Sequence, residues 1–403
     1  MRLGQIPGDL VHCALGDIFT LVAESSANDP HELTCTYRNL PNDLKAGETV
    51  LFADGTVAMT VTATAPDRAT LKVTLPGPLR SRQGVNLPGS ALTVPSLTDQ
   101  DLRDLDWTAR HASSVHFVGL SFARRAEDVA RLRQELQARK SPARIVVKIE
   151  KPEAVDRLDE IVAETDVVMV ARGDLGVEMD VHRVPAVQKR IIAACNRAHR
   201  PVITATQMLN SMEHSSRPTR AEASDVFNAV LDGSDAVMLS GESAIGDYPI
   251  EAVETMARIC AEAEAYAAKR PASIGDDAPL AGWIEPVTEA AVDAADLMTA
   301  RLKAPLIVVA TESGRTALAL SNRRPAATIL ALTRDAQLAA TLSICWGVTA
   351  IVRPADSSPE GAFAFGIEWA RAHGLVTRGQ HAVLVRGQAA DQPGGRAVLA
   401  REV

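Results

Sequence analysis

The chain has 403 residues with a formal net charge of −8, and 46% of its residues are hydrophobic and 23% charged. This length predicts roughly two to four domains, and the composition is that of an ordinary soluble globular protein. The acidic balance, with no basic block, excludes nucleic acid as the main partner, and no apolar run reaches the roughly 20 residues of a membrane helix.

Cysteine usage and the first residues indicate the compartment. The five cysteines are scattered and form no CxxC pair, which predicts reduced thiols and no disulfide framework or zinc site. The opening "MRLGQIPGDL" is not a signal peptide. A cytoplasmic location is therefore expected.

The first part of the chain, residues 8–92, predicts a small β-barrel. "VAMTVTATA" (Val57–Ala65) alternates between apolar and polar residues, and "ATLKVTL" (Ala69–Leu75) follows it directly after "PDR". Turn signals such as "ADG" and "LPG" separate the apolar runs.

Beyond Leu97 the pattern changes, and residues 93–272 predict alternating strands and helices. Continuously apolar strands separated by amphipathic helices are typical of a parallel sheet that is covered on both faces. Five such units in series predict part of a (β/α)8 barrel. The five expected strands are Val115–Phe122, Ala143–Glu150, Asp166–Gly173, Arg200–Gln207 and Asp235–Glu242.

A segment rich in Pro, Gly and Asp (Arg270–Pro286) predicts a linker, and residues 287–403 predict a further α/β domain. In this domain "TESGRTA" (Thr311–Ala317) follows an expected strand and opens an expected helix. Backbone N–H groups at a helix start can bind phosphate. The motif alone is equally compatible with an ordinary helix start. A Gly-rich stretch near the C-terminus, "RGQAADQPGGRAV", is more typical of a surface turn than of an effector loop.

Charged and hydroxyl residues stand at the ends of the expected barrel strands. Lys148 and Glu150 have the i, i+2 spacing that places two side chains on the same face of a strand. Asp174 follows the next strand and Thr206 the one after it. Two carboxylates at one edge suit Mg²⁺, and Lys148 beside them supplies a positive charge for a phosphoryl group.

Ser240 and Glu242 repeat the i, i+2 spacing at the fifth expected strand. Any one of these residues could be a polar strand end that meets solvent, which is the commoner case. Four successive strands with such ends favour an active site that binds an anion and a metal.

Several long motifs, in order, resemble the pyruvate kinase family. They are "KIEKPEAVDRLDEI", "VMVARGDLGVEM", "PVITATQMLNSM", "RPTRAEASDVFNAVLDGSDAVMLSGESAIGDYP" and "TESGRTA". The resemblance covers nearly the whole chain and is densest between Lys148 and Pro249. It implies phosphoryl transfer from phosphoenolpyruvate to ADP, giving pyruvate and ATP.

The resemblance also implies roles for individual residues. Lys148 matches the lysine that stabilises the transferring phosphoryl group, and Thr206 matches the threonine that helps to protonate the enolate. Glu150 and Asp174 match the ligands of Mg²⁺ (or Mn²⁺), and Arg2 matches an arginine on the nucleotide and phosphate side. The segment expected to receive the substrate comprises Ala171, Arg172, Gly173 and Asp174, with Thr206 beside it.

The fold implied is a TIM barrel of the pyruvate kinase type, incomplete at its N-terminus, with an inserted β-barrel lid and a C-terminal α/β regulatory domain. The family further implies K⁺, a cytoplasmic homotetramer and a phosphorylated effector. The effector loop would comprise Thr311, Ser313, Gly314, Arg315 and Thr316.

The chain departs from the family most at its start. Residues 1–7 match only the end of the third barrel strand, and the two preceding strand–helix units are absent. The family motif there carries a phosphate-binding arginine and much of the K⁺ site. Three explanations are open: a start placed too late in the gene, strands supplied by another chain, or a paralogue that binds ligands without catalysis.

Two other functions remain open at this point. One is a metal-dependent aldolase of pyruvate enolates, which Lys148 and the inserted β domain disfavour. The other is a regulatory binding protein that uses the "SGRT" loop as a sensor. The retention of Lys148, Glu150, Asp174 and Thr206 favours the kinase.

Overall fold

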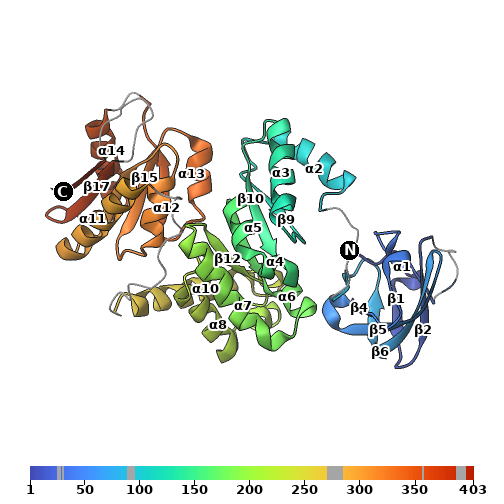
Figure 1. The fold of residues 1–403 in the computed structure, drawn as a ribbon. Helices are drawn as coiled ribbons and strands as arrows, with labels where there is room; N and C mark the ends of the chain where they lie inside the picture. Colours follow the sequence, from blue (N-terminus) through green and yellow to red (C-terminus); the bar gives the residue numbers. More distant parts are fainter. Residues whose placement is uncertain (25–28, 30, 89–95, 270–284, 356–357, 387–395) are drawn as a thin grey trace. The chain divides into compact units, whose positions relative to one another are not determined.

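The computed structural model describes residues 1–24, 29, 31–88, 96–269, 285–355, 358–386 and 396–403 (Figure 1). The chain divides into two compact units, and each is described by itself. Unit 1 comprises residues 1–98, 150–156 and 171–187, and unit 2 comprises residues 99–149, 157–170 and 188–403. The expected linker at 270–286 lies almost wholly, and the Gly-rich stretch at 386–398 mostly, outside the described residues.

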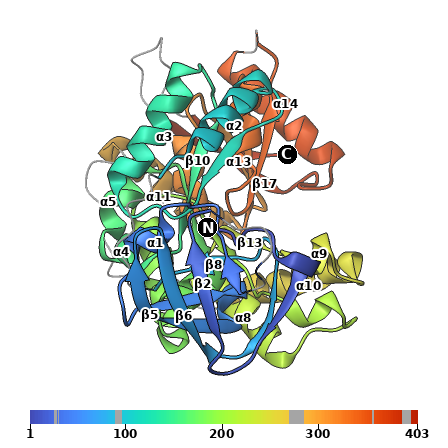
Figure 2. The same cartoon turned by 90° about the vertical axis from the view of Figure 1, so that its right-hand side faces the viewer.

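The β-rich part of unit 1 is a six-stranded sheet in the order β3-β2-β6-β5-β4-β8, together with the antiparallel pair β1-β7. The long strands β5 and β6 form a hairpin (Figure 2). Its tight turn contains Asp67, whose φ is 60°. The strands are β1 (Leu10–Cys13), β2 (Ile18–Val22), β3 (Glu32–Leu33), β4 (Thr49–Phe52), β5 (Val57–Ala65), β6 (Arg68–Leu75), β7 (Gly77–Arg80) and β8 (Val85–Asn86).

The core of this β-rich part follows from the period-two alternation of its strands. Ala69, Leu71 and Val73, at alternate positions of β6, are buried, and these side chains pack with Phe19 of β2 and Phe52 of β4. The short helical elements of this part are η1 (Pro7–Asp9), α1 (Leu40–Asp43) and η2 (Ala53–Gly55). The remainder of unit 1 contains α4 (Pro152–Asp156), α6 (Arg172–Glu178) and η3 (Val181–Arg183).

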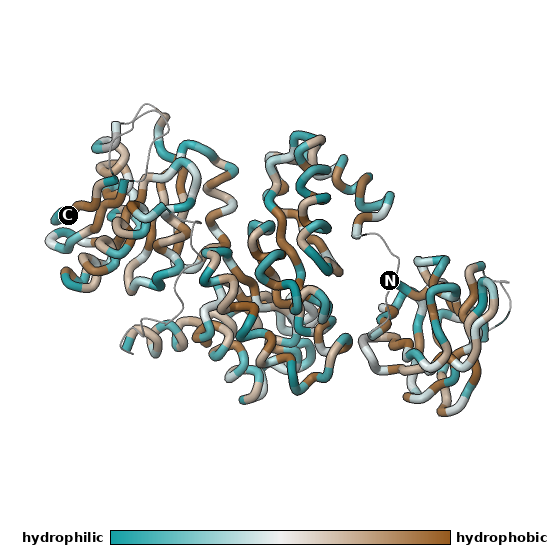
Figure 3. The backbone as a smooth tube through the Cα atoms, viewed as in Figure 1, coloured by the Kyte–Doolittle hydropathy of each residue, from teal (hydrophilic) through white to brown (hydrophobic). Residues whose placement is uncertain are grey.

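Unit 2 contains the five expected parallel strands, in the order β13-β12-β11-β10-β9. They are shorter than predicted: β9 (Phe117–Leu120), β10 (Arg144–Ile149), β11 (Val167–Ala171), β12 (Val202–Ala205) and β13 (Ala236–Met238). Strand β12, inside the sheet, is buried at all four positions, whereas the edge strand β13 is half-buried throughout. The hydropathy colouring shows the same apolar interior (Figure 3).

The helices that accompany these strands alternate with them along the chain. They are α2 (Asp99–Arg110), α3 (Ala126–Ala138), α5 (Leu158–Glu164), α7 (Val184–Arg197), η4 (Asn210–Glu213), α8 (Arg220–Leu231), α9 (Gly241–Ala244) and α10 (Pro249–Ala267). Helix α8 begins with a capping box in which Thr219 and Glu222 satisfy each other's backbone N–H groups. Among the helices of the described ranges, none has the length and apolarity needed to cross a bilayer.

The C-terminal part of unit 2 is a second sheet, in the order β16-β15-β14-β17-β18. Apolar residues alternate between its two faces: Ile307 and Val309 pack against α11, α12 and α13, while Leu306 and Val308 pack against α14. This explains why its strands are continuous apolar runs. The elements are α11 (Pro286–Leu302), β14 (Leu306–Ala310), α12 (Arg315–Asn322), β15 (Thr328–Thr333), α13 (Ala336–Leu342), β16 (Val348–Val352), α14 (Pro359–Ala372), β17 (His381–Arg386) and β18 (Ala397–Glu402).

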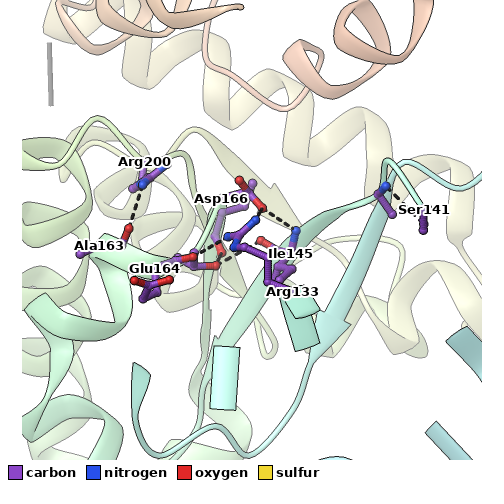
Figure 4. Close-up of polar contacts among 10 residues, drawn as sticks. Arg133, Ser141, Ile145, Ala163, Glu164, Asp166 and Arg200 are labelled. Atoms are coloured by element: carbon purple, nitrogen blue, oxygen red, sulfur yellow. Dashed lines mark hydrogen bonds and ion pairs between the residues drawn. The ribbon is translucent and has the colours of Figure 1, made fainter. Parts of the chain in front are cut away.

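Half-buried acidic residues secure the amino-terminal edge of the barrel sheet. Asp166, which precedes β11, accepts the backbone N–H of Ile145 at 2.9 Å and pairs with Arg133 of α3 at 3.2 Å (Figure 4). Arg133 also donates to the carbonyl of Glu164. The carboxylate therefore ties β10, β11 and α3 together at the edge opposite the expected active site.

Asp235 plays the same part before β13 and joins this sheet to the C-terminal part. Its carboxylate accepts the backbone N–H of Val202 at 2.9 Å and of Trp346 at 3.2 Å, and it pairs with Arg324 at 3.2 Å. Arg324 also donates to the carbonyl of Gly233 and lies over the Trp346 ring, 5.2 Å from its centroid. Burial raises the pKa of Asp235, and the nearby Arg324 opposes this effect.

We expect Asp235→Ala to lower the free energy of unfolding by about 3–5 kcal/mol, because it leaves the half-buried Arg324 without its counterion and the N–H groups of Val202 and Trp346 without their acceptor. Thermal and urea unfolding of the purified chain measure this change. Asp159→Ala is the matched control, since Asp159 is exposed and its ion pair with Arg197 is 3.8 Å long; such pairs contribute about 0–1 kcal/mol. A loss for Asp235→Ala no larger than that of the control would contradict the structural role.

His199 makes the stability of unit 2 depend on pH. Its side chain is buried, with 6% of the residue exposed, and burial together with the nearby Arg323 lowers its pKa to about 4. The unfolded chain, with a histidine pKa of 6.5, binds this proton more readily. The part of the free energy of unfolding that depends on His199 is therefore fully present above pH 6.5, and about 2–3 kcal/mol of it is lost by pH 4.5. Comparing the unfolding of wild type and His199→Gln at pH 7.5 and 4.5 isolates this contribution.

The His199→Gln variant should lose less stability on acidification than the wild type by that amount. The exposed His373 provides the control, because His373→Gln changes a histidine outside the core. Equal losses in wild type and His199→Gln would show that His199 does not carry the effect.

Candidate active site

Lys148 lies near the end of β10, in unit 2. The side chain is half-buried, and its Nζ donates a hydrogen bond to Ser121 Oγ at 3.1 Å. Ser121 comes directly after β9, which pairs with β10 in parallel register, with Leu120 opposite Val147. The ammonium group is thus held at the carboxyl edge of the sheet, where a charge for substrate binding was expected.

The same strand end carries the first predicted metal ligand. Glu150 follows β10 and is completely buried. Strands β10 and β11 pair in parallel up to Ile149 and Val170. Their carboxyl ends therefore meet at one edge, and the segments that follow both strands belong to unit 1.

Within unit 1, a buried ion pair links these two segments. Lys151 Nζ contacts Glu178 Oε1 at 2.6 Å, and Asn86 of β8 reaches the same oxygen at 3.5 Å. Glu178 is the last residue of α6, and this helix also packs against η2 of the β-rich part. The pair therefore fixes the segment after β10, helix α6 and the β-rich part to one another.

Helix α6 carries the expected substrate segment. Ala171 is its N-cap residue, and Arg172 is the first helical residue and is buried. Gly173 and Asp174 follow and are half-buried, so that Asp174 lies in the first turn of the helix. In the described part of the chain, no group of three or more His, Cys, Asp or Glu side chains is arranged to hold a metal. Two carboxylates remain a suitable set for Mg²⁺, which keeps several waters.

Thr206 follows β12 and occupies an unusual backbone conformation. Its φ is 67° and that of Gln207 is 52°, so two successive non-glycine residues are left-handed. The Thr206 hydroxyl donates to the carbonyl of Ala205 at 2.6 Å and is half-buried. β12 lies beside β11 in the sheet.

The remaining predicted site residues lie elsewhere. Arg2, in unit 1, is exposed, donates to the carbonyl of Arg82 at 3.1 Å and forms a backbone bridge with Gly84. The "TESGRT" loop follows β14 of the C-terminal sheet. Its Thr311 is buried and accepts the N–H of Gly314 at 2.9 Å, while Ser313 and Arg315 are exposed and Thr316 is buried.

Two contacts of this region escaped the sequence-based prediction: Ser121 contacts Lys148, and Lys151 pairs with Glu178. Glu242, which the spacing placed at a strand end together with Ser240, proves to be a buried acceptor of backbone N–H groups. The signal for Ser121 was available, because "VGLSF" places a hydroxyl directly after an apolar run. The Lys151–Glu178 pair joins residues 27 positions apart, and no local pattern predicts it.

A lysine, carboxylates and a threonine that follow successive strands of a parallel sheet suit metal-assisted phosphoryl transfer, which needs positioning and charge stabilisation. Comparison with known proteins agrees with this class. The family model for the pyruvate kinase barrel domain matches residues 7–253, and that for the pyruvate kinase alpha/beta domain matches residues 286–399. The chain therefore belongs to the pyruvate kinase family, and it is a phosphotransferase. The predicted fold class is confirmed.

Individual relatives give the same result. The pyruvate kinase of Clostridium acetobutylicum is 39% identical over 393 residues, which is 96% of this chain and 81% of that protein. The pyruvate kinase of Staphylococcus epidermidis is 40% identical over 361 residues, and the match spans 89% of this chain but only 61% of the relative. A crystal structure of a pyruvate kinase from Cryptosporidium parvum superposes with a TM-score of 0.85 at 35% identity, covering 99% of this chain and 81% of that one.

Members of this family act on phosphoenolpyruvate and ADP, and they depend in general on a divalent metal and on K⁺.

Proposed function

We propose that this chain transfers the phosphoryl group of phosphoenolpyruvate to ADP and protonates the resulting enolate to pyruvate. One observation supports this most strongly. Lys148, Glu150, Asp174 and Thr206 lie at or after the carboxyl ends of three successive strands of the parallel sheet, β10, β11 and β12. An aldolase of pyruvate enolates requires the carboxylates but has no need of a lysine next to a transferring phosphoryl group.

Each residue has a part that its position supports. Lys148, held by Ser121, would stabilise the negative charge on the phosphoryl oxygens. The backbone N–H groups of Arg172, Gly173 and Asp174 would orient the substrate carboxylate. The Thr206 hydroxyl would help to deliver a proton to the enolate carbon.

Glu150 and Asp174 would hold Mg²⁺ (or Mn²⁺). When bound, the cation would neutralise charge on the phosphoryl and enolate oxygens. The β-rich part of unit 1 would act as a lid that excludes water. The division into residues 1–7, 8–92, 93–272 and 287–403 is part of this proposal, as are Arg2 as a nucleotide contact and a K⁺ requirement.

Regulation and assembly are proposed on less direct support. The loop of residues 311–316 would bind a phosphorylated effector, because it links β14 to α12 and exposes Arg315. The homotetramer is proposed from family membership alone. Both are tested by sedimentation of the purified chain with and without sugar phosphates.

A coupled assay tests the central proposal. Purified chain, Mg²⁺, K⁺, phosphoenolpyruvate and ADP should give ATP and pyruvate in equal amounts. If the folded protein forms no ATP yet is thermally stabilised by these ligands, the binding-only alternative holds. Pyruvate formation without ADP would favour a different reaction.

A further inference from the structure

The turn after β12 is strained and needs support. Thr206 is β-branched, and at a φ of 67° its side chain crowds the backbone. Gln207, at 52°, continues the left-handed conformation. Each such residue costs of the order of 1–3 kcal/mol and persists only where neighbouring contacts hold it. Two acidic side chains hold the segment that directly follows this turn.

The first is Glu242, near the start of α9. Only 1% of its surface is exposed. Its Oε1 accepts the N–H of Leu209 at 2.9 Å, and its Oε2 accepts the N–H of Ser240 at 2.7 Å. One carboxylate thus ties the segment after β12 to the segment after β13. Both hydrogen bonds are charge-assisted, and such bonds are about twice as strong as neutral ones.

The second is Glu222, in the first turn of α8. It accepts the N–H of Ser211 at 2.7 Å and the Ser211 hydroxyl at 2.6 Å, besides closing the capping box with Thr219. Burial alone would raise the pKa of Glu222, but these hydrogen bonds outweigh it and hold the pKa below its usual 4.5. The carboxylate is therefore ionised at neutral pH.

Packing further restricts the segment of residues 206–213. Met208, Leu209 and Met212 are completely buried in one cluster with α8 and α10. Gly241 lies so close to Glu213 that an added Cβ would come within 1.9 Å of Glu213 Oε1. Residues 206–213 are therefore held from the side of α8 and from the side of α9, and Thr206 stands at the start of this fixed segment.

We propose that Glu242, supported by Glu222, is a positioning residue for Thr206: it holds the strained turn that presents the threonine hydroxyl for protonation of the enolate. The inference rests on the proposed function of Thr206 and adds the residues that orient it. Glu242 acts through the backbone of Leu209 and does not touch the substrate in this account. Its effect should therefore fall on the proton step and spare substrate binding.

The test compares two reactions of the full chain. The first is the overall reaction, which yields kcat and KM. The second is exchange of the pyruvate C3 hydrogens with D₂O, followed by NMR with Mg²⁺, K⁺ and inorganic phosphate present. By microscopic reversibility this exchange uses the same proton path in reverse, and it needs no phosphoryl transfer.

In Glu242→Gln, the side-chain amide places an NH₂ against one of the two backbone N–H groups, so one hydrogen bond is lost. We expect kcat and the exchange rate to fall together by about 10- to 100-fold, as small misplacements of a reacting group do. KM for phosphoenolpyruvate should stay within about threefold of the wild type. Glu251→Gln is the control, because Glu251 is an exposed acidic residue in the first turn of α10.

Three results would overturn the inference. The first is exchange in Glu242→Gln within twofold of the wild type. The second is a rise in KM with kcat unchanged. The third is a wild type that forms ATP but shows no exchange. If Glu242→Gln fails to fold, Glu222→Gln loosens the same segment at Ser211 and should lower exchange in the same direction; unchanged exchange there overturns the inference too.

A different result would contradict the proposed function, namely a folded wild-type protein that makes no ATP. Exchange that persists in such a protein and is lost in Glu242→Gln would still support the positioning role.

Discussion

Replacing Lys148 with methionine should lower kcat by about 10²- to 10³-fold, the loss typical when one preorganised group that stabilises transition-state charge is removed. Methionine retains the apolar stem but not the ammonium group that Ser121 orients. The interaction strengthens as negative charge shifts onto the transferring phosphoryl oxygens, so KM for phosphoenolpyruvate should change much less than kcat. Steady-state assays coupled to pyruvate formation measure both constants.

The matched control is Lys189→Met. Lys189 is largely exposed and pairs with Asp232 at the surface. This variant removes the same charge from unit 2 without touching the edge where β10 ends. Activity of Lys148→Met within tenfold of the wild type would mean that another group carries the phosphoryl charge, and the assignment of Lys148 would be wrong.

The strands of unit 2 were predictable because buried parallel strands are unbroken apolar runs between amphipathic helices. All five expected barrel strands are present, each shorter than its run. Because the strands are shorter, strand alternation no longer decides the direction of the side chains that follow them. β13 ends at Met238, and Ser240 has ψ of −100°, so the alternation that would have put Ser240 and Glu242 on one face no longer applies. Glu242 turns into the protein instead.

Other features could not be predicted because they depend on residues far apart in the sequence. The Lys151–Glu178 pair and the hydrogen bond from Asn86 need three separate segments to be folded first. The left-handed conformation of Thr206 contradicts the local preference of a β-branched residue. We infer that Glu242 supports it through the Leu209 N–H, which is 33 positions away in the sequence. Local preference fails here at the residue to which we assign a chemical role, as is common at functional sites.

The proposed metal site leads to a prediction that can be read without activity. Mg²⁺ that binds the native chain raises its stability by RT ln(1 + [Mg²⁺]/Kd), which is about 2.7 kcal/mol at a concentration of 100 Kd. Asp174→Asn keeps the size of the side chain but removes its charge, and Mg²⁺ takes few carboxylates from a protein, so each one matters. We expect the Mg²⁺-dependent rise in Tm seen in the wild type to shrink or vanish in this variant.

The same substitution should raise the Mg²⁺ concentration needed for half-maximal activity by at least about tenfold, since changes to groups that only hydrogen-bond to a metal ligand already cost about 10- to 100-fold in affinity. Asp180→Asn is the control, because Asp180 is exposed on the same segment, after α6. The two variants lose the same charge, so a general electrostatic effect on Mg²⁺ would lower both responses equally. That outcome would show that Asp174 is not a metal ligand. A loss confined to Asp174→Asn would identify its carboxylate as a ligand, and Glu150→Gln should then show the same loss of the Mg²⁺ response.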